Sequence, residues 1–224
     1  YKGEVVGFGF NPKEVKIQNE VIIPSTSTKF LGLIIQNDLK WDQQVSLLCN
    51  KIRWAAGRIQ SEGFLLSTND KKTLFNGWIM GALHANAAVF LPSISEGQLT
   101  SIQVAMNCGV RSVVNLPRRS HVSMSTIRKN LGIPSVAEIR DKCLMLTAYK
   151  HRDKYLDQND NLQGTITRAK SRGDILHPDQ RGHLGKMSST AMAIIWNKIP
   201  HEIRVEKNAN KASRMIKSLY KKTP

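Results

Sequence analysis

The histidines and acidic residues between positions 174 and 183 are the first candidates for chemistry. His177 and His183 lie in a polar stretch with Asp174 and Asp179 nearby. A loop of this composition could bind a divalent ion or supply a general base. Its spacing matches no metal-ligand motif. We therefore interpret it as a surface loop, and a nuclease or other enzyme built on it stays an alternative that a metal-dependence assay would test.

The cysteines and the glycine-rich start of the chain carry no recognisable catalytic motif. Cys49, Cys108 and Cys143 lie far apart, without metal-ligand spacing, and their odd number argues against a disulfide framework. Each falls in an apolar helical pattern, which predicts three buried thiols, no disulfide partner and a reducing compartment. Residues 7–10 alternate glycine and phenylalanine without the following helix that a phosphate-binding loop needs, so they predict a strand.

The positive charge is concentrated in the second half of the chain. The net charge of the 224 residues is +16. Residues 1–117 hold 11 Lys and Arg against 8 Asp and Glu (11 − 8 = +3), and residues 118–224 hold 22 against 9 (22 − 9 = +13). A basic half of this size predicts an acidic partner, most simply nucleic acid. A solvated basic surface, or a ribosome-type contact, is the alternative.

The elements that must position these residues begin with a small β-rich region. Apolar runs at residues 4–10, 13–17 and 21–23 predict strands, with a hairpin turn at Gln18-Asn19-Glu20. Residues 29–36 are predicted as a further strand, followed by an Asn37-Asp38 turn. Because the chain starts Tyr1-Lys2-Gly3 without a methionine, we expect it to be a piece of something longer.

Three amphipathic segments then predict a compact helical unit. They are residues 42–60, residues 71–91, which Pro92 stops, and residues 98–116. The second is rich in small residues, so we expect a partner helix to approach it closely. The predicted inward positions of the first and third are Val45, Leu48, Ile52, Ala55, Ala56, Ile59, and Leu99, Ile102, Met106, Val110, Val113.

Trp54 lies on the opposite face of the first of these helices, together with Leu47, Lys51 and Arg58. A second packing face against a neighbouring helix is the favoured interpretation. The alternative is a platform that touches a sugar–phosphate backbone.

The rest of the chain is basic and predominantly helical. A basic turn, Pro117 to His121, precedes predicted helices at residues 126–131 and 135–157, the second with Val136, Ile139, Cys143, Leu146 and Tyr149 inward. Residues 157–187 have the composition of a loop or linker. Helices are predicted at residues 188–199 and 209–222. The most apolar stretch, residues 84–92, is shorter than the roughly 20 residues of a membrane-spanning helix, so no membrane contact is expected.

Five short motifs follow one another along the chain. They are Lys29-Phe30-Leu31-Gly32-Leu33-Ile34-Ile35 with Leu39-Lys40-Trp41, Val114-Asn115-Leu116-Pro117-Arg118-Arg119, Leu131-Gly132-Ile133-Pro134-Ser135, Gly185-Lys186-Met187-Ser188, and Trp196-Asn197-Lys198-Ile199-Pro200-His201-Glu202-Ile203. Their order and spacing resemble the region after the palm in reverse transcriptases of non-LTR (LINE-like) retrotransposons. In that family the Leu-Gly strand belongs to the primer grip, and the helices after it form the thumb.

The resemblance implies a part of a polymerase without its chemistry. The family's polymerase uses metal-binding aspartates, two of them in an aromatic-Ala-Asp-Asp turn, that hold two Mg²⁺ ions. This sequence has no Asp-Asp pair, and Asp38 is better explained as a turn residue. We therefore expect no catalytic or metal-binding residue in this chain. Mg²⁺ is expected only for the complete polymerase, with upstream fingers and palm of the same polyprotein as a partner.

The sequence thus predicts an α+β, mostly α, fold in five segments. These are a small antiparallel sheet at the end of the palm (1–39), a three-helix thumb-like bundle (40–116), a helical connector (117–158), a polar loop (159–187) and basic C-terminal helices (188–224). The expected function is to bind RNA or an RNA–DNA hybrid, in the nucleus or cytoplasm. The expected contact residues are Lys29, Gly32, Lys51, Trp54, Arg58, Arg111, Arg118, Arg119, His121, Arg128, Lys129, Arg214 and Lys217.

A domesticated protein-interaction scaffold, with the basic charge serving solubility, is the alternative function. An exposed apolar patch around Trp54 or Trp196 would favour it.

Overall fold

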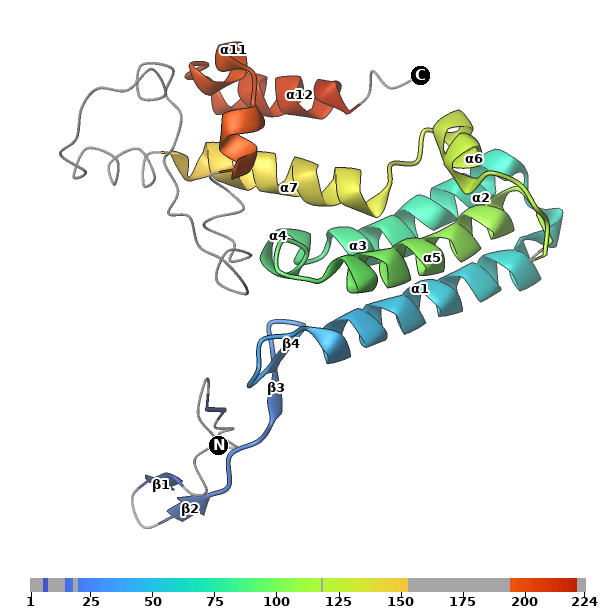
Figure 1. Cartoon of the computed structure of the whole chain (residues 1–224). Coiled ribbons are helices and arrows are strands. Elements are labelled where there is room, and N and C mark those ends of the chain that lie inside the picture. The colour runs from blue at the N-terminus through green and yellow to red at the C-terminus, as the bar shows by residue number, and fades with distance from the viewer. Residues whose placement is uncertain (1–5, 8–14, 18–19, 118, 153–193, 221–224) are drawn as a thin grey trace. The chain divides into compact units, whose positions relative to one another are not determined.

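The computed structural model describes residues 6–7, 15–17, 20–117, 119–152 and 194–220 (Figure 1). The chain forms two compact units, which we describe separately. The first consists of residues 1–86 and 94–115, and the second of residues 87–93 and 116–224. Short antiparallel strands precede a series of helices, which confirms the predicted α+β, mostly α, class. No helix within the described residues is both long and apolar enough to cross a membrane.

The strands form two separate hairpins. In the first, β1 (Val15–Ile17) pairs with β2 (Glu20–Ile22) in antiparallel register, with Ile17 opposite Glu20, so Glu20 belongs to a strand and not to the predicted three-residue turn. In the second, β3 (Ser27–Phe30) pairs with β4 (Leu33–Gln36), with Phe30 opposite Leu33. Of the strand predicted at residues 4–10, only residues 6–7 are described, and they are not in a strand.

The prediction of a single strand over residues 29–36 is wrong, because the chain reverses at Leu31-Gly32. Both residues have positive φ angles, 46° and 83°, as in the two-residue turns whose twist matches that of paired strands. Glycine adopts this conformation without a steric penalty. Thus the Leu-Gly pair of the first motif forms the turn of a hairpin.

Side chains attach this hairpin to the helix that follows, α1 (Asp42–Glu62). The Gln44 side-chain oxygen accepts a 2.9 Å hydrogen bond from the backbone N–H of Ile34 in β4. The Gln36 side-chain oxygen accepts another, also 2.9 Å, from the N–H of Gln43. Asp38 accepts a bond from the N–H of Lys40, which confirms its role as a turn residue. The hairpin and the start of α1 therefore share one hydrogen-bond network.

The second helical segment of the first unit is interrupted twice. It begins as α2 (Thr68–Phe75), where the capping residue Ser67 is paired with Asp70. It passes through a π-helical turn, η2 (Asn76–Met80), and ends with α3 (Gly81–His84). The predicted helix over residues 71–91 is therefore wrong at its end. The chain leaves the helix at residues 85–86, and Asn86 adopts a left-handed conformation with a φ of 61°.

The third helix, α5 (Glu96–Val113), packs against α1 along much of its length. All the inward positions predicted for α1 and α5 are buried, so both helical stripes are confirmed. Ser95 and Gln98 form a capping box at the start of α5. The Gln98 amide also donates to the backbone carbonyl of Lys40, at 2.8 Å, and to the carboxylate of Asp42, at 2.6 Å. It thereby joins the first turns of α5 and α1.

A close helix contact of this unit lies at Gly109 of α5, which packs against the second helical segment. A Cβ atom built on Gly109 would lie 2.4 Å from Ile79 Cδ1 and 3.0 Å from Phe75 Cε2. Gly77 and Gly81, in contrast, are exposed. The expectation that the small residues of the second helix would form the close approach is therefore not met at these two glycines.

Replacing Gly109 with valine is expected to lower the free energy of unfolding by about 1–3 kcal/mol, the usual cost of overpacking a core. Chemical denaturation followed by circular dichroism would measure the change. Gly57→Val is the matched control, because a Cβ on Gly57 of α1 meets no atom within 4 Å. It should leave stability unchanged or slightly raised, since valine has the better helix propensity. Equal effects at the two sites would contradict the close approach.

A buried lysine lies near the ends of α1 and α5. Lys71 is only 1% exposed, and its Nζ donates a 2.7 Å hydrogen bond to the side-chain oxygen of Asn115. Its aliphatic chain passes Gly63, where a Cβ would lie 3.1 Å from Lys71 Cε. Asn115 has a φ of 55°, a conformation that asparagine tolerates better than most residues. The sequence interpretation places Lys71 at the start of the second helix and does not identify it as buried.

The second unit contains α4 (Ala87–Phe90), α6 (Met124–Leu131), α7 (Val136–Lys150), a helical turn at residues 194–198, α11 (His201–Arg204) and α12 (Ala209–Leu219). Gly132 ends α6 with a φ of 64°, as its position predicts. Ser135 and Glu138 cap α7. The parts of the predicted helices at residues 153–157, 188–193 and 221–222 lie outside the described residues.

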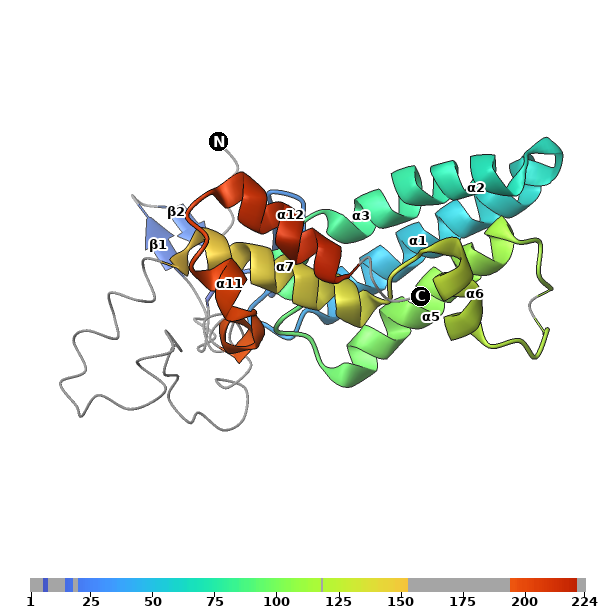
Figure 2. The ribbon, with the colours of Figure 1, turned by 90° about the horizontal axis from the view of Figure 1, so that it is seen from above.

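The core of the C-terminal helices forms between α7 and α12, which run side by side (Figures 1 and 2). Its buried members are Leu144, Met145, Ala148, Tyr149, Ile195, Trp196, Ile199, Ile203, Ala212 and Ile216. The Tyr149 hydroxyl donates to the backbone carbonyl of Glu206, and the Tyr220 hydroxyl contacts the Met145 sulfur at 3.5 Å. These contacts fix α12 antiparallel to α7.

The single inward stripe predicted for α7 is wrong at two positions. Cys143 and Leu146 are half-buried, whereas Leu144, Met145 and Ala148 are buried. The helix contacts α4 as well as α12. Because neighbours cover more than one of its sides, its buried residues follow no single helical stripe.

Candidate nucleic-acid interface

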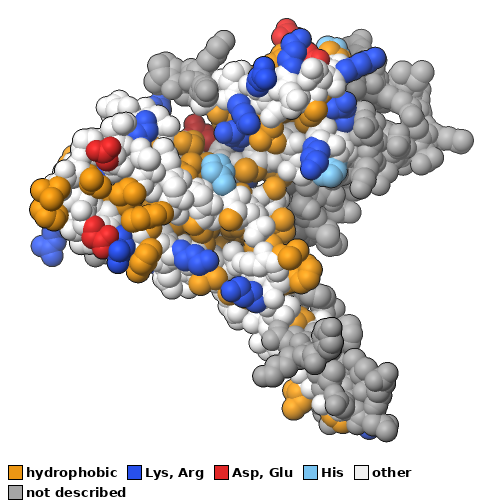
Figure 3. Space-filling model, turned by 180° about the vertical axis from the view of Figure 1, so that it is seen from behind, with side chains coloured by type: hydrophobic (Ala, Val, Ile, Leu, Met, Phe, Trp, Pro, Cys, Tyr) orange, Lys and Arg blue, Asp and Glu red, His pale blue; other side chains and the backbone are white. Residues whose placement is uncertain are grey.

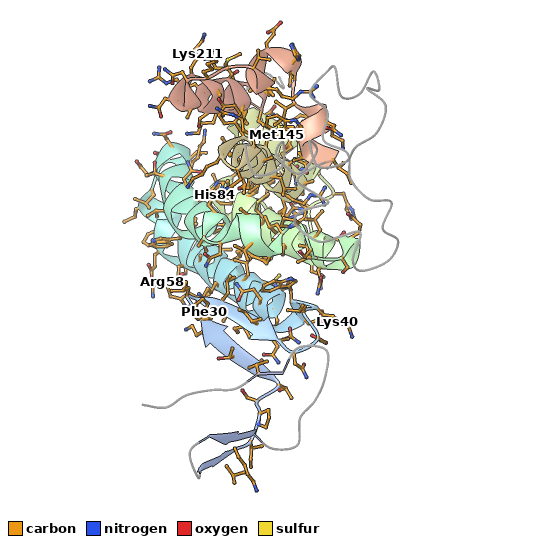
Figure 4. The ribbon with its side chains drawn as sticks, turned by 90° about the vertical axis from the view of Figure 1, so that its left-hand side faces the viewer. Phe30, Lys40, Arg58, His84, Met145 and Lys211 are labelled. Atoms are coloured by element: carbon orange, nitrogen blue, oxygen red, sulfur yellow. The ribbon has the colours of Figure 1, made fainter. Side chains whose placement is uncertain are left out.

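The tip of the second hairpin carries the two residues that the primer-grip resemblance selects. Lys29 is exposed on β3 opposite Ile34, and Gly32 is in the turn. Phe30 and Leu31 beside them are exposed apolar residues (Figure 4). The Asn86 amide donates a 3.4 Å hydrogen bond to the Leu31 carbonyl. The tip is therefore a small, exposed surface of one cation and two apolar side chains.

The outer face of α1 brings together Lys51, Trp54 and Arg58. The indole of Trp54 is 64% exposed, so the favoured interpretation of Trp54 as a helix-packing residue is wrong for the described structure. The Arg58 guanidinium lies over the Trp54 ring, 5.4 Å from its centroid. Arg58 Nε also forms a 2.6 Å ion pair with Glu62, four residues further on. The tryptophan is thus an exposed aromatic surface beside cations.

The basic stretch around α6 is less uniform than its sequence suggests. Arg119, His121 and Lys129 are exposed, but Arg128 is half-buried. Burial lowers the pKa of the Arg128 guanidinium, an effect that the charge of Glu138 opposes. Arg128 is consequently less available to an external phosphate than its neighbours. Arg118 lies outside the described residues, and Arg111 is half-buried in the last turn of α5.

The exposed side of α12 carries the predicted contacts Arg214 and Lys217, together with two lysines that the sequence interpretation did not select. Lys207 precedes the helix, and Lys211 lies in its first turn. Lys211 Nζ is 2.6 Å from Glu206, and this hydrogen bond raises the pKa of Lys211 and lowers that of Glu206. Figure 4 shows Lys211 on the outer side of α12 and Met145 beneath it. Within the helix, the three-residue spacing of 211, 214 and 217 was the sequence signal that successive basic side chains neighbour one another on α12.

Cations dominate the described part of the second unit. Residues 116–117, 119–152 and 194–220 hold 13 Lys and Arg against 4 Asp and Glu, so that 13 − 4 = +9, and residues 87–93 are uncharged. Figure 3 shows Lys and Arg side chains gathered over the upper part of its view, where the C-terminal helices lie. Such a density of exposed cations suits a phosphate backbone.

Possible metal ligands and thiols can be compared among the described residues. They contain no group of three or more His, Cys, Asp or Glu side chains that could hold a metal ion. Cys49 is buried, as predicted, but Cys108 and Cys143 are only half-buried, so that prediction is wrong for two of the three. Burial raises the pKa of the Cys49 and Cys143 thiols, which makes them poor nucleophiles. His177 and His183 lie outside the described residues.

Comparison with known proteins gives no relative. No family model, no curated protein and no solved structure matches this chain. The candidate interface therefore depends on the residues themselves. The candidate contact residues lie in three separate groups. These are the tip of the β3–β4 hairpin, the outer face of α1, and the basic surface of the second unit.

Proposed function

We propose that this chain is a nucleic-acid-binding module that holds RNA or an RNA–DNA hybrid by its phosphate backbone. The observation that supports this most is the net charge of +9 on the described part of the second unit, much of it on exposed side chains. The five motifs of the chain resemble the thumb and post-thumb region of a LINE-like reverse transcriptase. In that setting the catalytic aspartates and their Mg²⁺ ions belong to an upstream palm region, and the task of this chain is binding.

The exposed cations are suited to contact with a phosphate backbone. Lys129, Arg214 and Lys217 are exposed on helices. Lys and Arg side chains that neutralise phosphates release condensed counterions, which gives affinity without sequence preference. The described residues bring together no group of three or more His, Cys, Asp or Glu side chains that could hold a metal ion.

The salt dependence of binding tests this function. With six to ten phosphate contacts, the affinity for an RNA–DNA hybrid should fall by about 10³- to 10⁵-fold between about 50 and 200 mM salt. A filter-binding titration at several salt concentrations would measure the slope. Hybrids of unrelated sequence should give similar constants. Undetectable binding at low salt, or an affinity that does not change with salt, would refute the proposal.

A protein-interaction scaffold is the second candidate, and the exposed apolar residues of the first unit favour it. Trp54 is 64% exposed, and Phe64 and Leu65, in the turn η1 (Gly63–Leu65) after α1, are 75% and 82% exposed. Exposed apolar groups of this size often mark protein contacts. Trp196, in contrast, is buried and gives this candidate no support. A scaffold of this kind would not bind the hybrid in the titration above.

A further inference from the structure

We infer that Trp54 is a stacking platform for one unpaired nucleobase, with Lys51 on the same face to contact the adjoining phosphate. This inference rests on the proposed function and specifies which form of nucleic acid the first unit would take. The observation that supports it is the exposure of Trp54, which is 64% exposed in the middle of the long helix α1. Lys51 precedes it and Arg58 follows it on the same face of the helix.

The indole ring is held in place before any ligand arrives. The Arg58 guanidinium lies 5.4 Å from the ring centroid, and Glu62 holds that guanidinium by a 2.6 Å ion pair. Side chains of a helix lean towards its N-terminus, so Arg58, four residues later, covers the C-terminal side of the ring. The ring is nevertheless largely exposed. Part of the Trp54 ring therefore remains open to a ligand. Lys51 lies three residues before Trp54, on the same face of α1.

An open aromatic face selects an unpaired base. In a duplex each base is stacked between its neighbours, and only its edges and the backbone can be reached from the side of a helix. In a single strand every base has an accessible π-face, which stacks on Trp side chains irrespective of sequence. Phe64 is more exposed than Trp54, but it lies in the apolar turn Gly63-Phe64-Leu65-Leu66. Phe64 therefore serves as the control.

The test compares a single-stranded oligonucleotide with a blunt RNA–DNA hybrid of the same sequence, using the full chain. Trp54→Leu should weaken binding of the single strand by about 5- to 100-fold, the range seen when a stacking aromatic is removed. Trp54→Phe should retain most of the affinity, because phenylalanine also stacks. The affinity for the blunt hybrid should change less than twofold in both variants. Phe64→Leu should leave both affinities unchanged.

Tryptophan fluorescence gives a second, direct readout. Trp41 and Trp196 are buried, and Trp78 can be replaced by phenylalanine, so that Trp54 becomes the exposed tryptophan of the described residues. Adding the single strand should quench its emission, whereas the blunt hybrid should not.

The outcomes separate this inference from the proposed function. If the single strand and the hybrid bind with normal affinity to Trp54→Leu, stacking is refuted and the backbone-binding function stands. If both ligands are weakened equally, Trp54 supports a backbone contact, which also overturns stacking. If the unmodified chain binds neither ligand, the proposed function fails and the inference fails with it. RNA and DNA versions of the strand should behave alike, since stacking does not read the sugar.

Discussion

Replacing Trp196 with alanine is expected to lower the free energy of unfolding of the second unit by about 3–5 kcal/mol, as for other large buried aromatics. Trp196 is 2% exposed, and it belongs to the core formed by α7, α11 and α12. Alanine would leave a cavity that the other nine buried side chains of this core cannot close without rearranging. Chemical denaturation would measure the loss. Hydrogen exchange would locate it at the C-terminal helices.

Ile194→Ala is the matched control for this prediction. Ile194 lies in the same helical turn but is 40% exposed, so its truncation should cost less than about 1 kcal/mol. The Trp196 variant should also bind nucleic acid less well, because α12 is held against α7 by this core. A Trp196 variant as stable as the unmodified chain would mean that the C-terminal helices do not share a cooperative core.

Reversing two charges on α12, by Arg214→Glu together with Lys217→Glu, should weaken binding of an RNA–DNA hybrid by about 100-fold or more. Two charge-assisted contacts of about 1.5 kcal/mol each would be lost, and two repulsions would replace them. The slope of log affinity against log salt should become shallower by about 2. Both residues are exposed, so circular dichroism should show an intact helix.

The control for this pair changes the net charge equally in the first unit. Lys40 and Arg53 are exposed near the start and middle of α1, and neither is among the predicted contacts. Lys40→Glu with Arg53→Glu should reduce affinity only through long-range electrostatics, which about 0.15 M salt largely screens. Equal losses from the two double variants would show that affinity depends on total charge and not on a contact at α12.

The helical part of the fold could be predicted because its residues follow one simple period. In α1 and α5 each buried stripe faces one partner layer, so the 3.6-residue pattern alone identifies Ile52 and Met106 as core positions. In α7 the same reasoning failed at Cys143, because a helix covered on more than one side has no single stripe. The starts predicted for the second and third helices, residues 71 and 98, lie three and two residues after the observed starts at Thr68 and Glu96, which follow the capping residues Ser67 and Ser95.

The hairpin and the close helix contact could not be predicted from periodicity. Leu31-Gly32 interrupts an otherwise continuous apolar run, and leucine is an unusual residue for a position with positive φ. Gly109 and Gly77 have the same residue type in a helical pattern, yet only Gly109 faces close neighbours. The difference depends on the partner helix, which the sequence of one segment does not contain.

The sequence predicted the candidate interface as a set of residues, most of them cations. The structure shows which of these side chains are exposed to solvent. Trp54 and Lys217 are exposed, whereas Arg128 and Arg111 are half-buried. Burial of a charged side chain depends on packing between helices, and the burial that lowers the pKa of Arg128 in α6 is opposed by the charge of Glu138 in α7. Sequence alone therefore identified the residue types suited to phosphate, but not which of them solvent and ligand can reach.

The hydrogen bonds of Gln36, Gln44 and Gln98 have a consequence for motion. They tie the β3–β4 hairpin, the first turn of α1 and the start of α5 to one another through backbone groups. We therefore expect the hairpin turn at Leu31-Gly32 to move together with α1 when that helix tilts. A probe on that turn would report displacements of the long helix without touching the helix itself.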